Sequence, residues 1–322
     1  MTKQKNSLYN LKVISIIIPL FNAEASIFKL CSDIINSLVN HPNKKDLSFE
    51  FVLVNDCSAD NTLQECHKLK QEFPNFISFY DLASNVGEHN AVMAGLNLCK
   101  GDWAVIIDDD FQNPVSEIIK LIDFSVGNEF DVVFTRYSKK KHSAFRNFGS
   151  LINDKAANLV LNKPSNIYLS SFKAINRFII NEVIKYKGPF PYLDGLILDA
   201  TQNIGVLDVI HHMRADGESG YTLKKLIQLW SNMFFNFSIL PLRISIFFGL
   251  LTSLVAFCFG IYSFIESFIN PELPPGYSST IIILLFAFGI LQLSIGIVGE
   301  YIGRIFLSNN GKPQFTIRSK HK

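Results

Sequence analysis

The sequence predicts an α/β fold with a mainly parallel sheet covered by helices on both faces, followed by a two-helix membrane hairpin. Short β-branched runs alternate with helical patterns through the first part of the 322-residue chain. Polar residues follow these runs, and two long uncharged stretches lie near the C-terminus. Alternating strands and helices are typical of parallel sheets, whose strands are buried on both faces. With 48% hydrophobic residues, the chain has ample material for such a core.

Apolar runs rich in Val and Ile predict the strands, because each run is short and bounded by polar or turn residues. The expected strands lie at residues 13–20, 49–54, 77–80, 103–107 and 131–134. Helical patterns between and after them lie at residues 26–39, 62–72, 90–99 and 115–124. Beyond Arg136 the strand signal ends, and residues 145–161 and 175–186 are expected to be helical.

Residues 244–265 and 277–299 contain no Asp, Glu, Lys or Arg. At about 1.5 Å per residue, each stretch would form a helix that crosses the roughly 30 Å hydrocarbon core of a bilayer. The connector has no Lys or Arg, whereas both flanks carry several. The positive-inside rule then predicts a multi-pass protein of the inner (cytoplasmic) membrane, with both termini in the cytoplasm. The apolar run near the N-terminus is too short for a cleaved signal peptide, and Pro19 interrupts it.

These patterns divide the chain into four parts. We expect a cytoplasmic α/β domain at 1–221, interfacial amphipathic helices at 222–242, a transmembrane hairpin at 243–306 and a cytoplasmic tail at 307–322. The second part mixes aromatic and aliphatic side chains with Lys224 and Lys225, which suits helices lying at the surface of membrane lipid. A helix buried in a protein core is the alternative.

Composition argues against two classes of protein. The net charge is only +2, and no basic stripe with interleaved aromatic residues indicates a nucleic-acid partner. The five cysteines form no CxxC pair, which argues against a zinc site or a disulfide framework. The adjacent His211 and His212 would point to opposite faces of a strand, so they do not suggest a metal site.

Small residues recur in the second membrane stretch, at Gly296, Gly299 and Gly303. Small residues at this spacing let helix backbones approach closely in a membrane. They indicate a helix contact, either within the hairpin or between the subunits of a homo-oligomer.

Three consecutive carboxylates, Asp108, Asp109 and Asp110, follow the fourth predicted strand, and Gln112 comes shortly after. Carboxylates packed this closely repel one another unless a cation lies among them. Mg²⁺ and Mn²⁺ prefer oxygen ligands, so carboxylates and the amide oxygen of Gln112 suit either ion beside a diphosphate. Such an ion would neutralise charge on a nucleoside-diphosphate leaving group. A solvated acidic turn is the alternative.

The order of these motifs resembles family 2 glycosyltransferases. The segments that carry the resemblance are residues 15–22 (SIIIPLFN), 54–60 (VNDCSAD), 85–87 (NVG) and 108–114 (DDDFQNP). Residues 214–221 (RADGESGY), 241–243 (PLR) and 299–304 (GEYIGR) more narrowly resemble the polyprenyl-phosphate glycosyltransferases. That group includes dolichol-phosphate mannose synthase and the undecaprenyl-phosphate glucosyl and formamido-arabinosyl transferases.

The resemblance implies a GT-A catalytic domain that uses Mg²⁺ or Mn²⁺. It implies inverting transfer of a sugar from a nucleoside-diphosphate sugar to a polyprenyl phosphate, such as undecaprenyl phosphate, for modification of a cell-envelope glycan. Asp108 and Asp110 would act in catalysis, with Asp110 and Gln112 as metal ligands. The residues implied to bind the nucleotide sugar are Pro19, Phe21, Asn55, Asp56, Asn85, Asp108 and Asp109.

Two positions at the donor site depart from the family pattern. Ala23 stands where relatives often carry Glu, with Glu24 next to it, and Asn55 stands where they often carry Asp. An alternative reading of the Asn55 segment is the N-terminal turn of a helix, with Asn61 and Gln64 as a capping box.

Basic residues between the sheet and the membrane suggest the acceptor site. Arg136, Arg146 and Arg214 resemble positions that contact the lipid phosphate, and a guanidinium fork suits a phosphate. For Arg146, an ordinary surface charge is the alternative. Ile167 stands where many relatives carry an Asp regarded as a possible base, but a phosphate monoester with a second pKa of about 6 needs none. If a base acts, Asp194 is the candidate, and a structural turn is its alternative.

Two rival functions remain open. One is a glycosyltransferase that acts on a lipid-diphosphate-linked saccharide, whose hydroxyl nucleophile would need a base. The other is a catalytically silent membrane scaffold. The intact Asp108, Asp110 and Gln112 argue against the scaffold, whereas Ala23 and Ile167 favour it slightly.

Overall fold

The computed structural model describes residues 12–40, 47–137, 167–210, 240–269 and 277–322. The chain divides into two compact units, one of Met1–Thr222 with Pro313–Lys322 and the other of Leu223–Lys312. Several sequence predictions fall outside the described residues: the helix at 145–161, most of the interfacial segment, the histidine pair, and the site residues Arg146 and Arg214.

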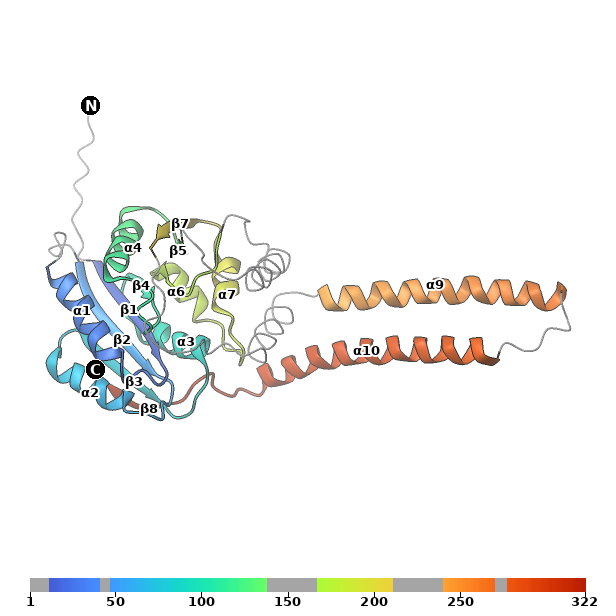
Figure 1. Cartoon of the computed structure of the whole chain (residues 1–322), viewed down its shortest axis with the longest axis horizontal. Helices are drawn as coiled ribbons and strands as arrows, with labels where there is room; N and C mark the ends of the chain where they lie inside the picture. Colours follow the sequence, from blue (N-terminus) through green and yellow to red (C-terminus); the bar gives the residue numbers. More distant parts are fainter. Residues whose placement is uncertain (1–11, 41–46, 138–166, 211–239, 270–276) are drawn as a thin grey trace, which may run out of the picture. The chain divides into compact units, whose positions relative to one another are not determined.

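The first unit is built on one sheet, shown in Figure 1. Its strands are β1 (Lys12–Leu20), β2 (Leu47–Asn55), β3 (Ile77–Leu82), β4 (Trp103–Ile106), β5 (Val132–Tyr137), β6 (Lys173–Asn176), β7 (Ile204–Val209) and β8 (Ile317–His321). They lie in the order β7-β5-β6-β4-β1-β2-β3-β8. Strands β4, β1, β2 and β3 are parallel, as are β5 and β7. Strands β6 and β8 run antiparallel to the strands they pair with. The ends of β4, β1 and β2 therefore meet at one edge, called here the carboxyl edge.

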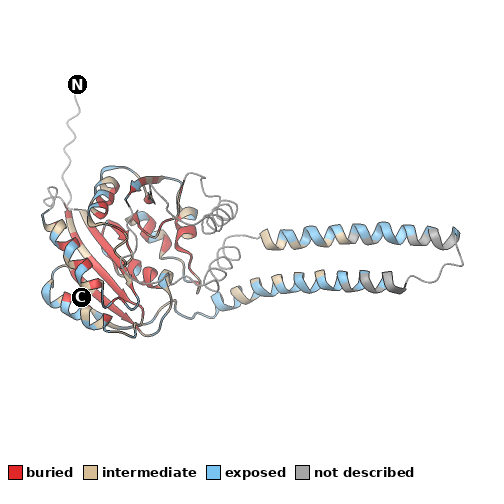
Figure 2. Ribbon diagram, in the orientation of Figure 1, coloured by how far each residue is buried: buried red, intermediate tan, exposed pale blue. Residues whose placement is uncertain are grey.

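Helices cover both faces of this sheet. They are α1 (Ile27–Val39), α2 (Thr62–Glu72), α3 (Glu88–Leu98), α4 (Val115–Gly127), α6 (Arg177–Val183) and α7 (Leu193–Ala200). Side chains of α1, α2 and α4 share one core with Ile16 and Ile18 of β1. Side chains of α3, α6 and α7 share the other core with Ile17. Because β1 is buried from both sides, its sequence is continuously apolar rather than alternating, and Figure 2 shows the central strands almost wholly buried.

The five predicted strands and the first four predicted helices are confirmed, with ends shifted by a few residues. The helix predicted at 175–186 is partly wrong. Its start belongs to β6, and α6 begins at Arg177 after Asn176, whose side chain accepts a hydrogen bond from the amide of Ile179. Strands β7 and β8 were also missed, because each pairs with a strand distant in sequence and carries polar residues at exposed positions.

The end of the chain, expected as a cytoplasmic tail at 307–322, contains regular structure. Helix α10 continues to Asn309, and Pro313–Lys322 belong to the first unit. There β8 pairs with β3 at the edge of the sheet. Local sequence pattern offers little sign of this strand, because its pairing partner lies more than two hundred residues earlier in the chain.

The second unit contains the two apolar helices, α9 (Leu240–Ile269) and α10 (Tyr277–Asn309). They run side by side in Figure 1, and the hydroxyl of Ser245 donates to the hydroxyl of Ser294 over 2.6 Å. Leu240–Tyr262 and Phe286–Asn309 are long and apolar enough to cross a membrane. Their large side chains are exposed along much of their length, which indicates membrane association, since a bilayer would cover them.

Among the described residues, the small residues of α10 make no close contact inside this hairpin. A Cβ atom added at Gly296, Gly299 or Gly303 would meet no atom of the described residues within 4 Å. Contact between subunits stays a prediction.

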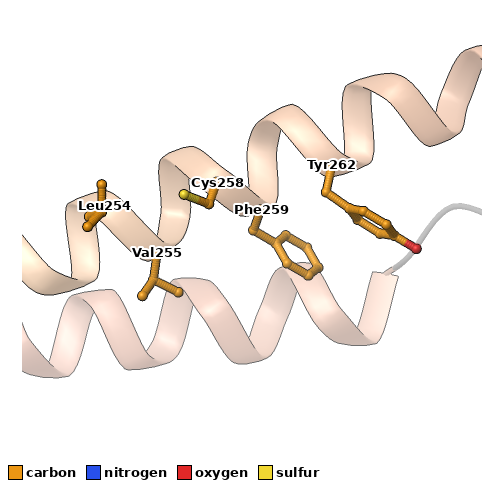
Figure 3. A pocket seen from close by; sticks show the side chains of 5 residues that line it. All are labelled: Leu254, Val255, Cys258, Phe259 and Tyr262. Atoms are coloured by element: carbon orange, nitrogen blue, oxygen red, sulfur yellow. The ribbon is translucent and has the colours of Figure 1, made fainter.

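An apolar hollow of about 420 Å³ lies on the hairpin. Its lining residues are Leu254, Val255, Cys258, Phe259 and Tyr262, all from α9, as Figure 3 shows. None of the predicted site residues lines it. Its side chains suit lipid hydrocarbon rather than a polar reaction. The predicted donor residues lie instead at the carboxyl edge of the sheet.

Candidate functional site

The acidic run forms a tight turn directly after β4. Phe111 adopts a left-handed conformation, with φ of 56°, and the amide of Gln112 donates to Oδ1 of Asp110 over 3.1 Å. The turn leaves all three carboxylates of the run half-buried at the carboxyl edge. Asp110 and Gln112, the predicted metal ligands, therefore lie on the same turn.

Burial and neighbouring carboxylates raise the pKa values of two side chains in this turn. Burial raises the pKa of Asp108 to about 7, with a further contribution from the negative charges of Glu88 and Asp110. Burial and the neighbouring Asp108 raise the pKa of Asp109 to about 6. The hydroxyl of Ser171 donates to Asp108 over 2.6 Å, which partly offsets the rise. An added cation would relieve this repulsion.

The carboxylate of Asp56 holds the loop that leads into α3. It accepts hydrogen bonds from the amides of Val86 at 2.7 Å and Gly87 at 2.9 Å. Burial raises the pKa of Asp56, and these two amides oppose that rise. The side chain of Asn85 donates to the Asp56 carbonyl over 3.3 Å. Gly87 has a φ of 85°, a conformation that favours glycine. The loop thus depends both on this glycine and on the hydrogen bonds to the Asp56 carboxylate.

Asn55 is turned toward the neighbouring strand. It is 2% exposed, its amide nitrogen donates to Asp81 Oδ1 over 2.7 Å, and its amide oxygen accepts from the Ser58 hydroxyl at 2.6 Å. A direct contact with the donor, as predicted, has little support, because these bonds occupy its polar atoms. The Asp that relatives often carry here would lie against Asp81 without a proton to donate, and an amide removes that conflict.

The alternative reading of the Asn55 segment is correct in that a helix, α2, begins after Asn61, but the capping box it included does not form. The Asn61 side chain makes no capping bond and instead donates to Oε2 of Glu24 over 2.9 Å. The Asn61 amide donates to the same oxygen. Glu24 thus joins the loop after β1 to the start of α2, while the neighbouring Ala23 is buried.

Phe21 presents an open ring at the end of β1. Its side chain is 54% exposed, unusual for a large apolar residue beside a buried strand. The next residue, Asn22, has a φ of 55° and its side chain accepts from the amide of Ala59 over 3.0 Å. Pro19 precedes them and pairs with β2. An exposed aromatic face held by a hydrogen-bonded turn suits stacking with a nucleotide base.

The structure therefore brings most predicted donor residues to one place. Phe21, Asp56 and Asp108 follow three neighbouring strands, β1, β2 and β4, at the carboxyl edge. Ligands of open α/β sheets bind at such an edge.

Arg136 lies on β5, which is separated from β4 by strand β6 in the sheet. Its guanidinium donates to both carboxylate oxygens of Asp208, at 2.6 and 2.9 Å. Both side chains are half exposed. The fork predicted to hold a lipid phosphate is therefore paired with a carboxylate of β7 in this structure.

A second charged cluster was missed in the sequence. The buried ammonium of Lys173 is hydrogen-bonded to Asp194, and Glu88 begins α3 nearby. Desolvation raises the pKa of Glu88, Lys173 opposes the rise, and Asp194 adds to it. A lysine inside the apolar run at 172–175 was the available signal, because an unpaired lysine is rarely buried.

Asp110 and Gln112 fit a hard divalent cation. They offer carboxylate and amide oxygens on one turn, beside Asp108 and Asp109, whose pKa values are raised by burial and by neighbouring carboxylates. In the described part of the chain, no group of three or more His, Cys, Asp or Glu side chains forms a complete metal site. The remaining ligands would be oxygens of a diphosphate or water.

The family models match both units. Residues 15–184 match the model of glycosyl transferase family 2, and residues 240–305 match the GtrB C-terminal hairpin. The chain belongs to glycosyl transferase family 2. It is therefore a glycosyltransferase with a GT-A type fold, which confirms the predicted fold and enzyme class.

Curated relatives resemble this family member over nearly its whole length. It is 28% identical to undecaprenyl-phosphate 4-deoxy-4-formamido-L-arabinose transferase of Aeromonas hydrophila, covering 96% of this chain and 94% of that one. It is 29% identical to the protein of the same name from Yersinia enterocolitica, covering 96% and 93%. The crystal structure of a mycobacterial protein shares the fold with a TM-score of 0.52 at 15% identity, covering 70% and 75%.

Proposed function

We propose that this glycosyltransferase moves a sugar from a nucleoside-diphosphate sugar to a polyprenyl phosphate, with undecaprenyl phosphate as the acceptor. The observation that carries the proposal is the acidic turn at Asp108–Asp110 beside Phe21 and Asp56, in a chain that also has an apolar hairpin. The names of the curated relatives support the same acceptor. Modification of a cell-envelope glycan is the process that such a product would serve.

The carboxyl edge supplies the donor site in this proposal. The ring of Phe21 stacks on the base, and the loop held by Asp56 borders the ribose and diphosphate. Asp108 and Asp109 face the donor, with Asp109 oriented by a 3.3 Å hydrogen bond from Ser26. Asp110 and Gln112 hold Mg²⁺ or Mn²⁺, which when bound stabilises negative charge on the departing diphosphate.

The acceptor phosphate serves as the nucleophile. Its second pKa is about 6, so at neutral pH an anionic oxygen is already available. That oxygen forms a bond to the anomeric carbon while the bond to the diphosphate oxygen breaks and its electron pair leaves with the nucleoside diphosphate. Attack opposite the leaving group inverts the configuration.

Asp194 has little support as a base for this step. It is 8% exposed and is hydrogen-bonded to the ammonium of Lys173. We assign it a structural role instead. In this proposal Arg136, Arg146 and Arg214 bind the acceptor phosphate. Arg136 would first have to give up its ion pair with Asp208.

The membrane arrangement completes the proposal. A polyprenyl chain stays in the bilayer, so a hairpin of two spanning helices keeps the enzyme beside its acceptor. Both ends of the hairpin carry Lys and Arg, which supports a cytoplasmic catalytic domain in the inner membrane. Nucleotide sugars would then reach the site from the cytoplasm.

Membranes that contain the full chain provide the test. Given labelled nucleotide sugars and undecaprenyl phosphate, they should yield a labelled lipid-phosphate sugar. Asp110→Ala should lower the rate by about a hundredfold or more, because several kcal/mol of charge stabilisation is lost. Asp33→Asn, an exposed carboxylate on α1, is the matched control and should retain activity.

Three results would contradict the proposal. Full activity of Asp110→Ala would reject the metal ligand. Label that appears only on a lipid-diphosphate-linked saccharide would favour the other acceptor class. Failure to bind any of UDP, GDP or dTDP in the presence of Mn²⁺ would favour a silent scaffold.

A further inference from the structure

Strand β8, near the C-terminus, pairs with β3, the neighbour of β2 in the sheet. Strand β8 pairs antiparallel with β3, with Leu82 opposite Ile317 and a register shift between Asp81 and Leu82. Beyond the strand, the amide of Ala83 donates to the carbonyl of Thr316 over 2.8 Å. The segment after the membrane hairpin therefore borders the loop that Asp56 holds.

Arg318 binds two groups on and after β3. Its Nη1 lies 3.3 Å from Asp81 Oδ2, and its Nη2 donates to the carbonyl of Ala83 over 3.1 Å. Asp81 is 2% exposed, whereas Arg318 is largely exposed. The arginine is thus the cation that neutralises a buried carboxylate, and an uncompensated buried charge is strongly unfavourable.

The same carboxylate continues the hydrogen-bonded chain toward β1. Asp81 Oδ1 accepts from Asn55 over 2.7 Å, and Asn55 accepts from the hydroxyl of Ser58 at 2.6 Å. That hydroxyl in turn accepts from the amide of Asn22 over 3.0 Å. The chain of contacts runs from Arg318 to the residue that follows Phe21, without a gap.

A second branch leads to the loop before α3. Ala83, whose carbonyl and amide both bond to the C-terminal segment, directly precedes residues 84–87. Asp56 binds the amides of Val86 and Gly87 in that loop. Both loops that border the proposed donor site are therefore connected to Arg318.

We propose that Arg318 is a positioning residue for the nucleotide-sugar site, through which the C-terminal strand holds the Phe21–Asn22 turn and the residue 84–87 loop. The inference rests on the proposed donor function. It assigns the segment after the membrane hairpin a part in donor binding, although Arg318 does not touch the donor. Loss of the cation leaves the buried Asp81 carboxylate uncompensated, so this side chain should shift away from its present position and its hydrogen bond with Asn55 should weaken.

Kinetics of the full chain test the effect on the donor. Arg318→Met should raise the donor KM about tenfold, the scale of one lost hydrogen bond to a charged group. The kcat and the acceptor KM should stay within about twofold. Arg318→Lys, which can still neutralise Asp81, should recover much of the donor affinity. Lys320→Met removes a similar charge from an exposed site on the same strand and should behave as wild type.

Hydrogen exchange tests the inference without any turnover, so it separates this inference from the proposed function. Arg318→Met should accelerate exchange at residues 21–24 and 84–88. Adding Asp81→Asn should restore protection at both loops, because the neutral amide needs no cation and can still accept from Asn55. Exchange that increases only within β8, or that the second substitution does not restore, would overturn the inference. So would an unchanged donor KM in an active Arg318→Met enzyme.

Discussion

The ammonium of Lys173 is buried against the carboxylate of Asp194, which ties β6 to the first turn of α7. The two residues are only 2% and 8% exposed. The ammonium also lies 5.4 Å from the centre of the Phe134 ring. Burying these two charges costs desolvation energy, and their mutual attraction offsets most of that cost. The pair therefore adds little net stability, but removing one partner leaves the other charge buried and uncompensated.

The first prediction concerns this pair. Lys173→Met should lower the free energy of unfolding by about 3–5 kcal/mol, because it leaves Asp194 as an uncompensated buried charge. The double variant Lys173→Met, Asp194→Leu should recover most of the loss, since both groups become apolar. Chemical unfolding of the detergent-solubilised chain measures both values. Lys185→Met, which removes an exposed lysine paired with Glu182, should change stability little. A double variant as unstable as Lys173→Met would contradict this account.

Lys173 also shows where sequence reasoning stops. The apolar run of β1 predicted its strand because both faces are buried, and the acidic turn was predicted because it directly follows a strand. Strand β6 is four residues long, begins with Lys173, and is defined only by its partners β4 and β5. Its identity depends on tertiary pairing, which local pattern does not contain.

The site divides in the same way. The positions of Phe21, Asp56 and Asp108 follow from strand order, because the ends of parallel neighbours share an edge. The roles of Asn55 and Arg318 depend on Asp81, which lies on another strand and joins them. No spacing in the sequence relates these three residues, so that network could be found only in the structure.

The second prediction concerns close packing at Gly101. A Cβ atom there would lie 2.6 Å from the Ser15 amide nitrogen and 2.7 Å from the Trp103 carbonyl oxygen. These are backbone atoms of paired strands and cannot yield easily. Gly101→Ala should therefore destabilise the chain by about 1–3 kcal/mol or more. Gly127→Ala, where an added Cβ meets nothing within 4 Å, is the control. Equal melting temperatures for the two variants would show that the β1–β4 contact is looser than described.

The third prediction tests Arg136 as an acceptor ligand. Its bond with Asp208 is a surface ion pair, so breaking it should barely change the melting temperature. Arg136→Gln should raise the KM for polyprenyl phosphate and leave the donor KM unchanged. Asp208→Asn frees the guanidinium and should leave the acceptor KM equal or lower. If both variants raised the acceptor KM alike, the ion pair itself, rather than a free Arg136, would be what the enzyme needs.

The fourth prediction concerns His89, whose pKa is affected by burial and by two charged residues. Burial lowers the pKa of His89, Asp194 opposes the change and Lys173 adds to it. The ring of Tyr192 packs edge-on against the imidazole, with 5.6 Å between the ring centres. The folded chain therefore favours the neutral imidazole, and the unfolded chain takes up a proton near the ordinary pKa of about 6.5.

The sign of the pH effect follows from that difference. Because the unfolded state binds more protons in this window, the contribution of His89 to stability is fully present above about pH 6.5 and is lost as the pH falls toward the folded pKa. Asp108 and Asp109, whose pKa values are raised to about 7 and about 6, act in the opposite direction.

The effect of His89 must therefore be measured as a difference between the wild type and a variant. Unfolding free energies between about pH 7.5 and 5 should fall more steeply for the wild type than for His89→Gln. Parallel curves for wild type and His89→Gln would mean that His89 has the same pKa in both states.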